Sequence, residues 1–182
     1  MRMEVNRRRN SNRLAWHDYS QPGEYFVTMC TKDREDMFGE IIGGEMRLND
    51  RGEIAVKSWK EILLYFPSIE LDEFVVMPNH VHGIIAIVGM MGPASAMFPG
   101  GAIQESPRLD RDDPVWRRRM LLPKIIGRFK QNSAKQINIL RGTSGMPVWQ
   151  RGYYDRIIRD PKSLARIRAY IVCNPRRWEM NE

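Results

Sequence analysis

The first part of the chain combines a run of β-forming residues with a glycine turn, and it predicts strands. Residues 24–30 (EYFVTMC) are rich in aromatic and β-branched side chains, which is typical of a strand. Two short apolar runs then flank Gly43 and Gly44, a pair that readily adopts the positive φ angles of a tight turn. Residues 38–49 are therefore predicted to form a hairpin.

A helix and a second pair of strands follow this hairpin. Asp50 followed by Glu53 matches a capping box with Asp50 as the N-cap, and apolar residues recur at helical spacing until Pro67 ends the run. Residues 69–78 and 81–88 are apolar runs of strand length. Because the link between them is very short, these two strands are predicted to pair antiparallel.

The second half of the chain predicts two further helices with a short strand between them. The first has a buried stripe at helical spacing, made of Leu122, Ile125, Ile126, Phe129, Ile137 and Leu140. Residues 147–150 are a candidate short strand. Asp160 followed by Pro161 predicts the start of the last helix, and Pro175 is predicted to stop it.

The order of these elements predicts one α+β domain over residues 1–182. Strands and helices follow one another as β, hairpin, α, β-β, α, β, α, which indicates a mainly antiparallel sheet with helices on one face. A ferredoxin-like core of βαββαβ order fits, with an N-terminal hairpin and a C-terminal helix added to it. Residues 89–114 lack any period and are rich in Gly, Pro and Ser, so we expect a mobile loop there.

The charge is unevenly distributed and indicates a polyanionic partner. The net charge is +7, and residues 115–141 hold eight basic residues and no acidic ones. Such a cluster is typical of nucleic-acid binding, because neutralised phosphates release condensed counterions. A solvated helix face and a membrane surface are the weaker alternatives. The basic residues are Arg117, Arg118, Arg119, Lys124, Arg128, Lys130, Lys135 and Arg141.

The sequence predicts neither a membrane protein nor a secreted one. No apolar run approaches the ~20 residues that a bilayer-spanning helix needs. Residues 1–13 form a basic arm without the apolar stretch of a secretory signal. Cys30 and Cys173 fit a reducing compartment, and their spacing resembles no zinc module. We therefore expect a cytoplasmic protein.

His80 and His82 are the sharpest local feature of the sequence. Residues two apart on a strand point to the same face, so both imidazoles can reach one metal ion. No carboxylate follows shortly downstream, so a remaining ligand has to come from elsewhere. A half-exposed histidine pair without a metal is an equally open interpretation of this spacing. His17, the third histidine, is expected to be a surface residue.

Tyrosines near the C-terminus supply candidate nucleophiles. Tyr170 and Asn174 are spaced i and i+4 on the last predicted helix, so they lie on one face. By spacing alone, an aromatic at the edge of the core and a residue at a helix end are the favoured interpretations. Tyr153 and Tyr154 compete as nucleophiles, and beside Arg151 they are also candidates for stacking on bases.

Taken together, these motifs resemble the REP-associated tyrosine transposases, a group within the single-tyrosine HUH transposases of the insertion-sequence-200 type. The similarity runs from about residue 7 to residue 178. It is carried by segments that include FVVMPNHVHGIIAI, WQRGYYDRIIRD and RAYIVCNPRRW. A lone His-x-His pair would be weak, but its combination with YIxxN on the last helix, in this order, is specific.

The resemblance implies a role for each candidate residue. His80 and His82 match the metal ligands of the family, and Tyr170 matches its nucleophile. Asn174 matches the polar residue that completes the metal site. The resemblance also gives Tyr153 and Tyr154 structural or DNA-contact roles.

The reaction implied by the resemblance is cleavage and rejoining of single-stranded DNA through a 5′-phosphotyrosine intermediate, with Mg²⁺ or Mn²⁺ as the cofactor. Hairpin DNA such as repetitive extragenic palindromes is the implied substrate. A catalytically inactive nucleic-acid-binding relative and a hydrolase that uses metal-activated water stay open as alternatives, as does a homodimer. The expected DNA contacts are Arg117, Arg118, Arg119, Lys124, Arg128, Lys130, Lys135, Arg151 and Tyr153.

Overall fold

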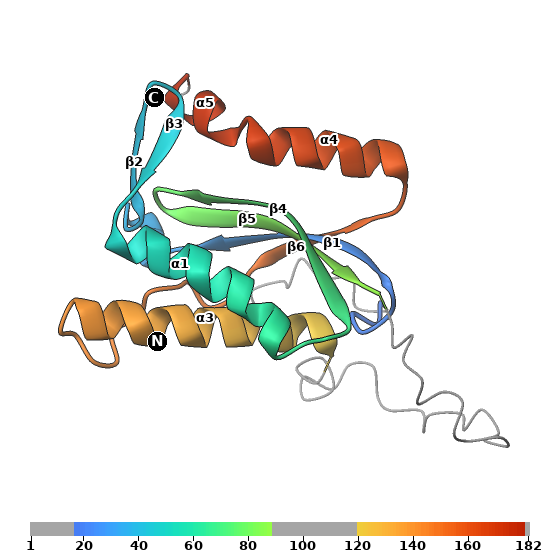
Figure 1. Ribbon diagram of the computed structural model, residues 1–182, viewed down its shortest axis with the longest axis horizontal. Coiled ribbons are helices and arrows are strands. Elements are labelled where there is room, and N and C mark those ends of the chain that lie inside the picture. The colour runs from blue at the N-terminus through green and yellow to red at the C-terminus, as the bar shows by residue number, and fades with distance from the viewer. Residues whose placement is uncertain (1–16, 89–119, 181–182) are drawn as a thin grey trace, which may run out of the picture.

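A four-stranded antiparallel sheet forms the centre of the protein in the computed structural model, which describes residues 17–88 and 120–180 (Figure 1). The sheet has the strand order β4-β5-β1-β6, and each neighbouring pair is antiparallel. Its strands are β1 (Gly23–Cys30), β4 (Ile69–Met77), β5 (His80–Ile87) and β6 (Tyr154–Ile158). With its helices, the chain follows the βαββαβ order of the predicted ferredoxin-like core.

Two helices cover one face of this sheet, as predicted (Figure 1). They are α1 (Asp50–Lys60), extended by the 3₁₀ turn η2 (Glu61–Leu64), and α3 (Leu121–Leu140). The main hydrophobic core lies between these helices and the sheet. Trp59 of α1 and Phe129 of α3 meet edge-on in it, at 5.6 Å between ring centroids. Alternate residues of β1, such as Val27 and Met29, point into this core and are fully buried.

A C-terminal helix, α4 (Pro161–Val172), covers the opposite face of the sheet (Figure 1). Its start is the predicted one, because the Asp160 side chain accepts a hydrogen bond from the Ser163 amide at 2.8 Å. Ile167 and Ile171 of this helix are buried in a second, smaller core cluster with Ile84 of β5 and Ile158 of β6.

An ion pair fixes the same helix to the edge of the sheet. Arg168 Nη2 lies 2.7 Å from Asp72 Oδ2, and its Nε also donates to this carboxylate. Asp72 lies at the irregularity between Leu71 and Phe74, where the pairing of β4 with β5 shifts register. The register shift and the ion pair thus occur at the same point of the edge strand.

The structure corrects two sequence-based predictions about element ends. The N-cap of α1 is Asn49, whose side chain accepts from the amides of Arg51 and Gly52, so the cap precedes Asp50 by one residue. Asn caps a helix as well as Asp does, and Asp50 occupies the first turn, where a carboxylate favours the helix dipole. α4 ends at Val172, before Pro175 as predicted, but the chain becomes helical again in α5 (Asn174–Glu179). Pro175 lies in the first turn of α5, where the missing amide proton has no partner to lose, so Asn174 lies on a different helix from Tyr170 and not on the same one as predicted.

The last strand is also displaced from its predicted position. The last strand is β6 (Tyr154–Ile158). Residues 147–150 contribute only an isolated bridge between Thr31 and Trp149. Val148 and Trp149 are buried, which explains their apolar character, but they pack as a loop against the core. The apolar residues of this segment therefore reflect burial in the core and not pairing with a neighbouring strand.

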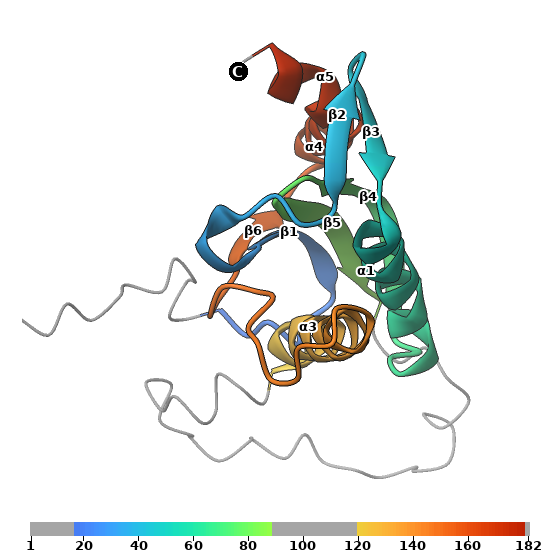
Figure 2. The same cartoon turned by 90° about the vertical axis from the view of Figure 1, so that its left-hand side faces the viewer.

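The predicted hairpin is present and supports α5. It consists of β2 (Gly39–Ile42) and β3 (Glu45–Leu48), with Gly43 and Gly44 at φ angles of 62° and 76° in the turn. The Gly43 amide donates to the Glu179 carboxylate at 3.1 Å. Figure 2 shows this hairpin standing beside α5, beyond the end of the sheet.

Several sequence-based predictions concern residues outside the part that the structure describes. These are the basic arm at residues 1–13, the expected loop at residues 89–114, and the expected DNA contacts Arg117, Arg118 and Arg119. Within the described ranges, none of the helices combines the length and the apolar character that crossing a bilayer requires.

Candidate active site

The two histidines of β5 project from the face of the sheet that α4 covers. Val81 between them points the other way and is fully buried in the main core. His82 is buried and His80 is half-buried. Both rings line a pocket of about 510 Å³, and Tyr170 and Asn174 line the same pocket. The structure therefore brings together the four residues that the sequence resemblance had singled out.

The imidazoles converge through their Nε2 atoms, which lie 3.0 Å apart. On the far side of each ring, the Nδ1 atom has a fixed partner. Asn79 Oδ1 lies 2.9 Å from His80 Nδ1, and since an amide oxygen only accepts, His80 carries its proton on Nδ1. Its Nε2 therefore presents a lone pair to the pocket. Such outer partners orient the rings of metal-binding histidines.

The second imidazole has a partner that can act in both directions. The Thr28 hydroxyl lies 2.8 Å from His82 Nδ1 and can either donate to it or accept from it. With Nδ1 protonated, His82 Nε2 would also present a lone pair, and both lone pairs would face one cation. With Nε2 protonated, His82 donates to His80 instead. The hydroxyl thus permits the tautomer that metal binding requires.

Burial keeps both imidazoles neutral. Burial and then the positive charge of Arg34 lower the pKa of His80 to about 4. Burial and then the neighbouring His80 lower the pKa of His82 to about 3. Neutral imidazole is the form that ligates a metal, so neither ring has to lose a proton near neutral pH.

Tyr170 approaches the histidines from α4. Its Oη lies 3.4 Å from His82 Nε2, and the two ring centroids are 5.3 Å apart. Phe26 meets the tyrosine ring edge-on at 6.1 Å and stacks on His82 at 5.3 Å. Tyr170 is 36% exposed, so part of its side chain remains accessible to solvent beside the histidines.

The available donor atoms fit a mixed nitrogen and oxygen metal site. Asn174, buried at the start of α5, adds a carboxamide to the two imidazoles. The described residues contain no group of three or more His, Cys, Asp or Glu side chains that could hold a metal. A zinc site of the Cys/His type therefore does not fit these residues. Two imidazoles and an amide oxygen suit Mn²⁺, and Mg²⁺ with water ligands.

Sequence reasoning missed five further residues that line the pocket. They are Thr28, Cys30, Arg34, Arg177 and Trp178. Alternation along the strands was the signal that could have found Thr28, because it points away from the core residues on either side of it. Trp178 packs near His80, at 5.5 Å between ring centroids.

The tandem tyrosines point to opposite sides of the sheet. Tyr153, the expected DNA contact, is partly buried against the main core. Tyr154 is half exposed and lines the same pocket as His80 and His82, paired with Thr28 across the sheet. An aromatic surface for a base is therefore available at Tyr154, and much less of Tyr153 is accessible.

The expected DNA contacts on α3 lie on the other side of the sheet from this pocket (Figure 1). Lys124 and Lys135 are exposed there, and Arg151 is exposed in the loop before β6. The remaining two already have protein partners. The Arg128 guanidinium lies 3.8 Å from the centroid of the Tyr65 ring, and Lys130 donates to the Gln150 carbonyl at 3.0 Å.

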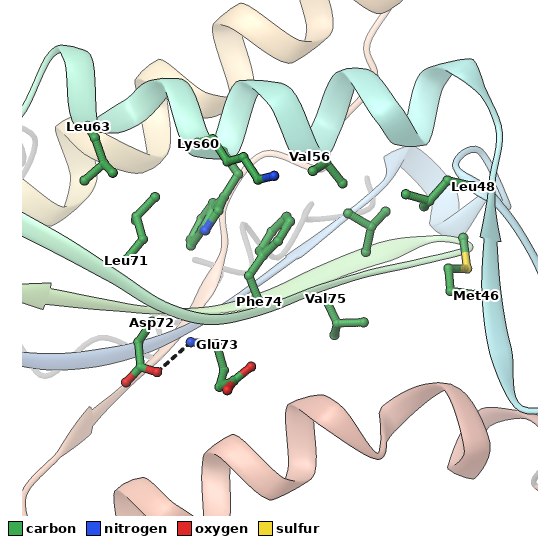
Figure 3. Close-up of a pocket in the computed structure, with 12 residues that line it drawn as sticks. Met46, Leu48, Val56, Lys60, Leu63, Leu71, Asp72, Glu73, Phe74 and Val75 are labelled. Carbon is green, nitrogen blue, oxygen red and sulfur yellow. Dashed lines mark hydrogen bonds between the residues drawn. The ribbon is translucent and has the colours of Figure 1, made fainter.

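A larger pocket of about 740 Å³ lies between α1 and the edge strand β4 (Figure 3). Its walls are mainly apolar, with Val56 and Leu63 from the helix side and Phe74 and Val75 from the strand. It contains neither a histidine nor a tyrosine, so it lacks the groups that the predicted chemistry needs.

The chain has relatives among known proteins. No protein-family model matches the chain. An uncharacterized protein from Haemophilus influenzae is 37% identical over 175 residues, which cover 96% of this chain and 92% of that protein. The chain belongs to the same family as this Haemophilus protein.

The chain is also similar to a solved REP-associated tyrosine transposase that is bound to a REP hairpin. The TM-score is 0.50 at 19% sequence identity, and the match covers 89% of this chain and 72% of that chain. This likeness confirms the fold that the sequence resemblance implied.

The neutral histidines predict how stability depends on pH. Both folded-state pKa values lie below the ordinary 6.5, so the unfolded chain takes up protons first as the pH falls. The histidines therefore favour the folded state above pH 6.5, and this contribution is lost on acidification toward their folded values. We expect the free energy of unfolding of the metal-free protein to fall from pH 7 to pH 5 by up to about 1.4 kcal/mol per pH unit for each histidine.

Urea titrations across this range measure the effect. The double variant His80→Gln/His82→Gln should show a clearly smaller loss of stability on acidification than the wild type. Equal slopes for the two proteins would show that the histidines are not held neutral by burial.

Proposed function

We propose that this protein cleaves and rejoins single-stranded DNA by metal-dependent transesterification, with Tyr170 as the nucleophile. The observation that carries the proposal is the 3.4 Å approach of Tyr170 Oη to Nε2 of His82, beside a second converging imidazole. The fold likeness to a transposase bound to a REP hairpin supports DNA as the substrate. The net charge of +7 supports a polyanionic partner.

The covalent step follows from the chemistry of a phenol. Tyr170 Oη attacks the scissile phosphorus, its proton leaves to water, and the bond from phosphorus to the 3′ oxygen breaks. The departing 3′ oxygen takes up a proton, and the 5′ phosphate stays on Tyr170. A 3′ hydroxyl from the same or another strand can reverse these steps. Because the phosphotyrosine keeps the energy of the broken ester, rejoining requires no ATP.

The chain's own groups would hold the metal ion and orient the nucleophile. His80 Nε2, His82 Nε2 and the Asn174 amide oxygen are the proposed ligands for Mg²⁺ or Mn²⁺. When bound, such an ion supplies positive charge that neutralises the scissile phosphate and favours the phenolate over the phenol, whose ordinary pKa is about 10. Phe26 fixes the ring planes of His82 and Tyr170 relative to each other.

Aromatic side chains at the pocket suit an unpaired strand. Tyr154 is half exposed, and Trp178 lines the pocket beside His80. Bases stack on such rings without regard to sequence, which favours single-stranded DNA over a closed duplex at the reacting phosphate. Hairpin DNA would satisfy this with a single-stranded flank in the pocket. Lys124, Lys135 and Arg151 are exposed for contacts farther from the reacting phosphate.

Replacement of Tyr170 by Phe should abolish covalent attachment to DNA and leave DNA binding largely unchanged. The variant lacks only the hydroxyl, so the packing on Phe26 and His82 is retained. The measurement is denaturing gel electrophoresis after incubation with hairpin oligonucleotides that carry single-stranded flanks, in the presence of Mn²⁺. Tyr154→Phe is the matched control in the same pocket, and it should still form the adduct.

The same gels separate the alternatives. An adduct that survives in Tyr170→Phe and disappears in Tyr154→Phe would show that Tyr170 is not the nucleophile. Release of a 5′ phosphate with no adduct at any time would indicate hydrolysis by activated water. Binding with neither cleavage nor adduct would indicate an inactive nucleic-acid-binding protein.

Removal of a proposed ligand should weaken metal binding directly. We expect His80→Ala and His82→Ala each to lower the affinity for Mn²⁺ by at least about 10-fold, the lower end of the cost of losing even a supporting residue of a metal site. Isothermal titration calorimetry without DNA measures this. His17→Ala is the control, because His17 contacts Tyr25 and lies outside the pocket. Unchanged affinity in both ligand variants would rule out this metal site.

A further inference from the structure

A short turn after β1 brings a positive charge to the catalytic pocket. The turn η1 (Lys32–Arg34) lies between β1 and the hairpin, and Arg34 lines the pocket together with His80, His82 and Tyr170. Sequence analysis assigned no role to this residue. Its side chain is exposed, and within the described part of the chain it forms no ion pair.

The backbone of this turn is strained. Asp33 and Arg34 have φ angles of 55° and 58°, and they are the only residues other than glycine with positive φ in the described ranges. Aspartate tolerates this conformation comparatively well, but a long side chain such as arginine rarely adopts it. Strain of this kind persists only where surrounding contacts impose it, and it gathers at functional sites.

Hydrogen bonds tie the turn to the residues that precede His80. The Thr31 amide donates to the Asn79 carbonyl at 2.9 Å. The buried Thr31 hydroxyl lies 2.9 Å from the same carbonyl and 2.8 Å from the Glu35 carbonyl, so it closes the turn around Arg34. Asn79 also holds the His80 ring through its side chain. The backbone at Arg34 is therefore fixed relative to the proposed metal ligands.

The charge balance of the pocket favours an anion. Among the residues that the structure describes, its lining includes two guanidinium groups, on Arg34 and Arg177, and no carboxylate. The Arg177 guanidinium lies over the Tyr170 ring, at 5.9 Å from the centroid. Arg34 belongs to the turn after β1, in the N-terminal part of the chain. Guanidinium groups bind phosphate oxygens with two parallel N–H donors, a geometry that lysine lacks.

We propose that Arg34 binds a non-bridging oxygen of the scissile phosphate and stabilises the negative charge that develops there while Tyr170 attacks. This inference rests on the proposed function, because it assigns a further catalytic residue to the same pocket. Arg34 exchanges no proton in this role. The bonds that form and break remain those between phosphorus and Tyr170 Oη and between phosphorus and the 3′ oxygen. A positively charged donor at this point stabilises the transition state where the negative charge develops.

Single-turnover rates of adduct formation test the proposal on two substrates. The first is a hairpin oligonucleotide with an ordinary phosphodiester at the mapped cleavage site. The second carries a neutral methylphosphonate at that position. On the phosphodiester, Arg34→Ala should react more slowly than the wild type by on the order of 100-fold. On the methylphosphonate, which lacks one charged oxygen, the two proteins should react at similar rates for at least one of its two stereoisomers.

Two further variants serve as controls. Arg47→Ala removes the same charge from an exposed position on β3 outside the pocket, and its rate should match the wild type. Arg34→Gly suits the positive φ angle, so it should melt no lower than the wild type and still lose the same activity as Arg34→Ala. A glycine variant that loses activity without losing stability distinguishes catalysis from folding.

The outcomes separate this proposal from the one on which it rests. An adduct in the wild type, with Arg34→Ala equally fast on the phosphodiester, would overturn the role of Arg34 and leave the function of Tyr170 intact. An equal loss for Arg34→Ala on the phosphodiester and on both methylphosphonates would also overturn it, because the arginine would then not act on the phosphate charge. Absence of any adduct in the wild type would overturn the proposed function itself.

Discussion

The packing of α4 on the sheet creates the short distance between Tyr170 and His82, which are 88 residues apart in the sequence. Without that packing, the imidazoles of β5 would face solvent and the phenol would have no partner. Few buried side chains contribute to the packing of α4, because the cluster under this helix is much smaller than the main core. Ile171 is the direct neighbour of Tyr170 and is almost fully buried. The residue that anchors the helix and the proposed nucleophile are thus adjacent in the chain.

Two contacts outside this small cluster hold α4 and α5 in place. The ion pair of Arg168 with Asp72 attaches α4 to the edge of the sheet, two residues before Tyr170 in the same helix. The hairpin supports α5 through the hydrogen bond from Gly43 to Glu179, and this helix carries Asn174 and Trp178. The hairpin is an addition to the ferredoxin-like core. Its position explains how an addition far from the C-terminus in sequence can shape the pocket.

Much of the fold could be predicted because its local signals agree with the tertiary structure. The aromatic and β-branched residues of β1, the glycine turn of the hairpin and the cap at Asp160 each act over a few residues, and each is confirmed. The strand β6 was missed because YDRII is short and carries charges at two positions. Its pairing is decided by β1, which lies far away in sequence. Local patterns carry no information of that kind.

The four residues proposed to bind metal and react could be singled out from the sequence, and the residues around them could not. Spacing places His80 and His82 on one face, but only the resemblance linked them to Tyr170 and Asn174. The orientation of Tyr154 depends on the register of β6, and the position of Arg34 depends on a turn held by the distant Asn79. Both are tertiary effects. A strained turn has no sequence signature when its residues are aspartate and arginine in place of glycine.

Mass spectrometry of the trapped protein–DNA adduct tests the central claim most directly. After digestion with nuclease and trypsin, the remaining 5′ nucleotide marks the peptide that carried the covalent bond. The account predicts this mass on residues 169–176, which contain Tyr170 as their only tyrosine. The same mass on residues 152–156, which contain Tyr153 and Tyr154, would contradict it.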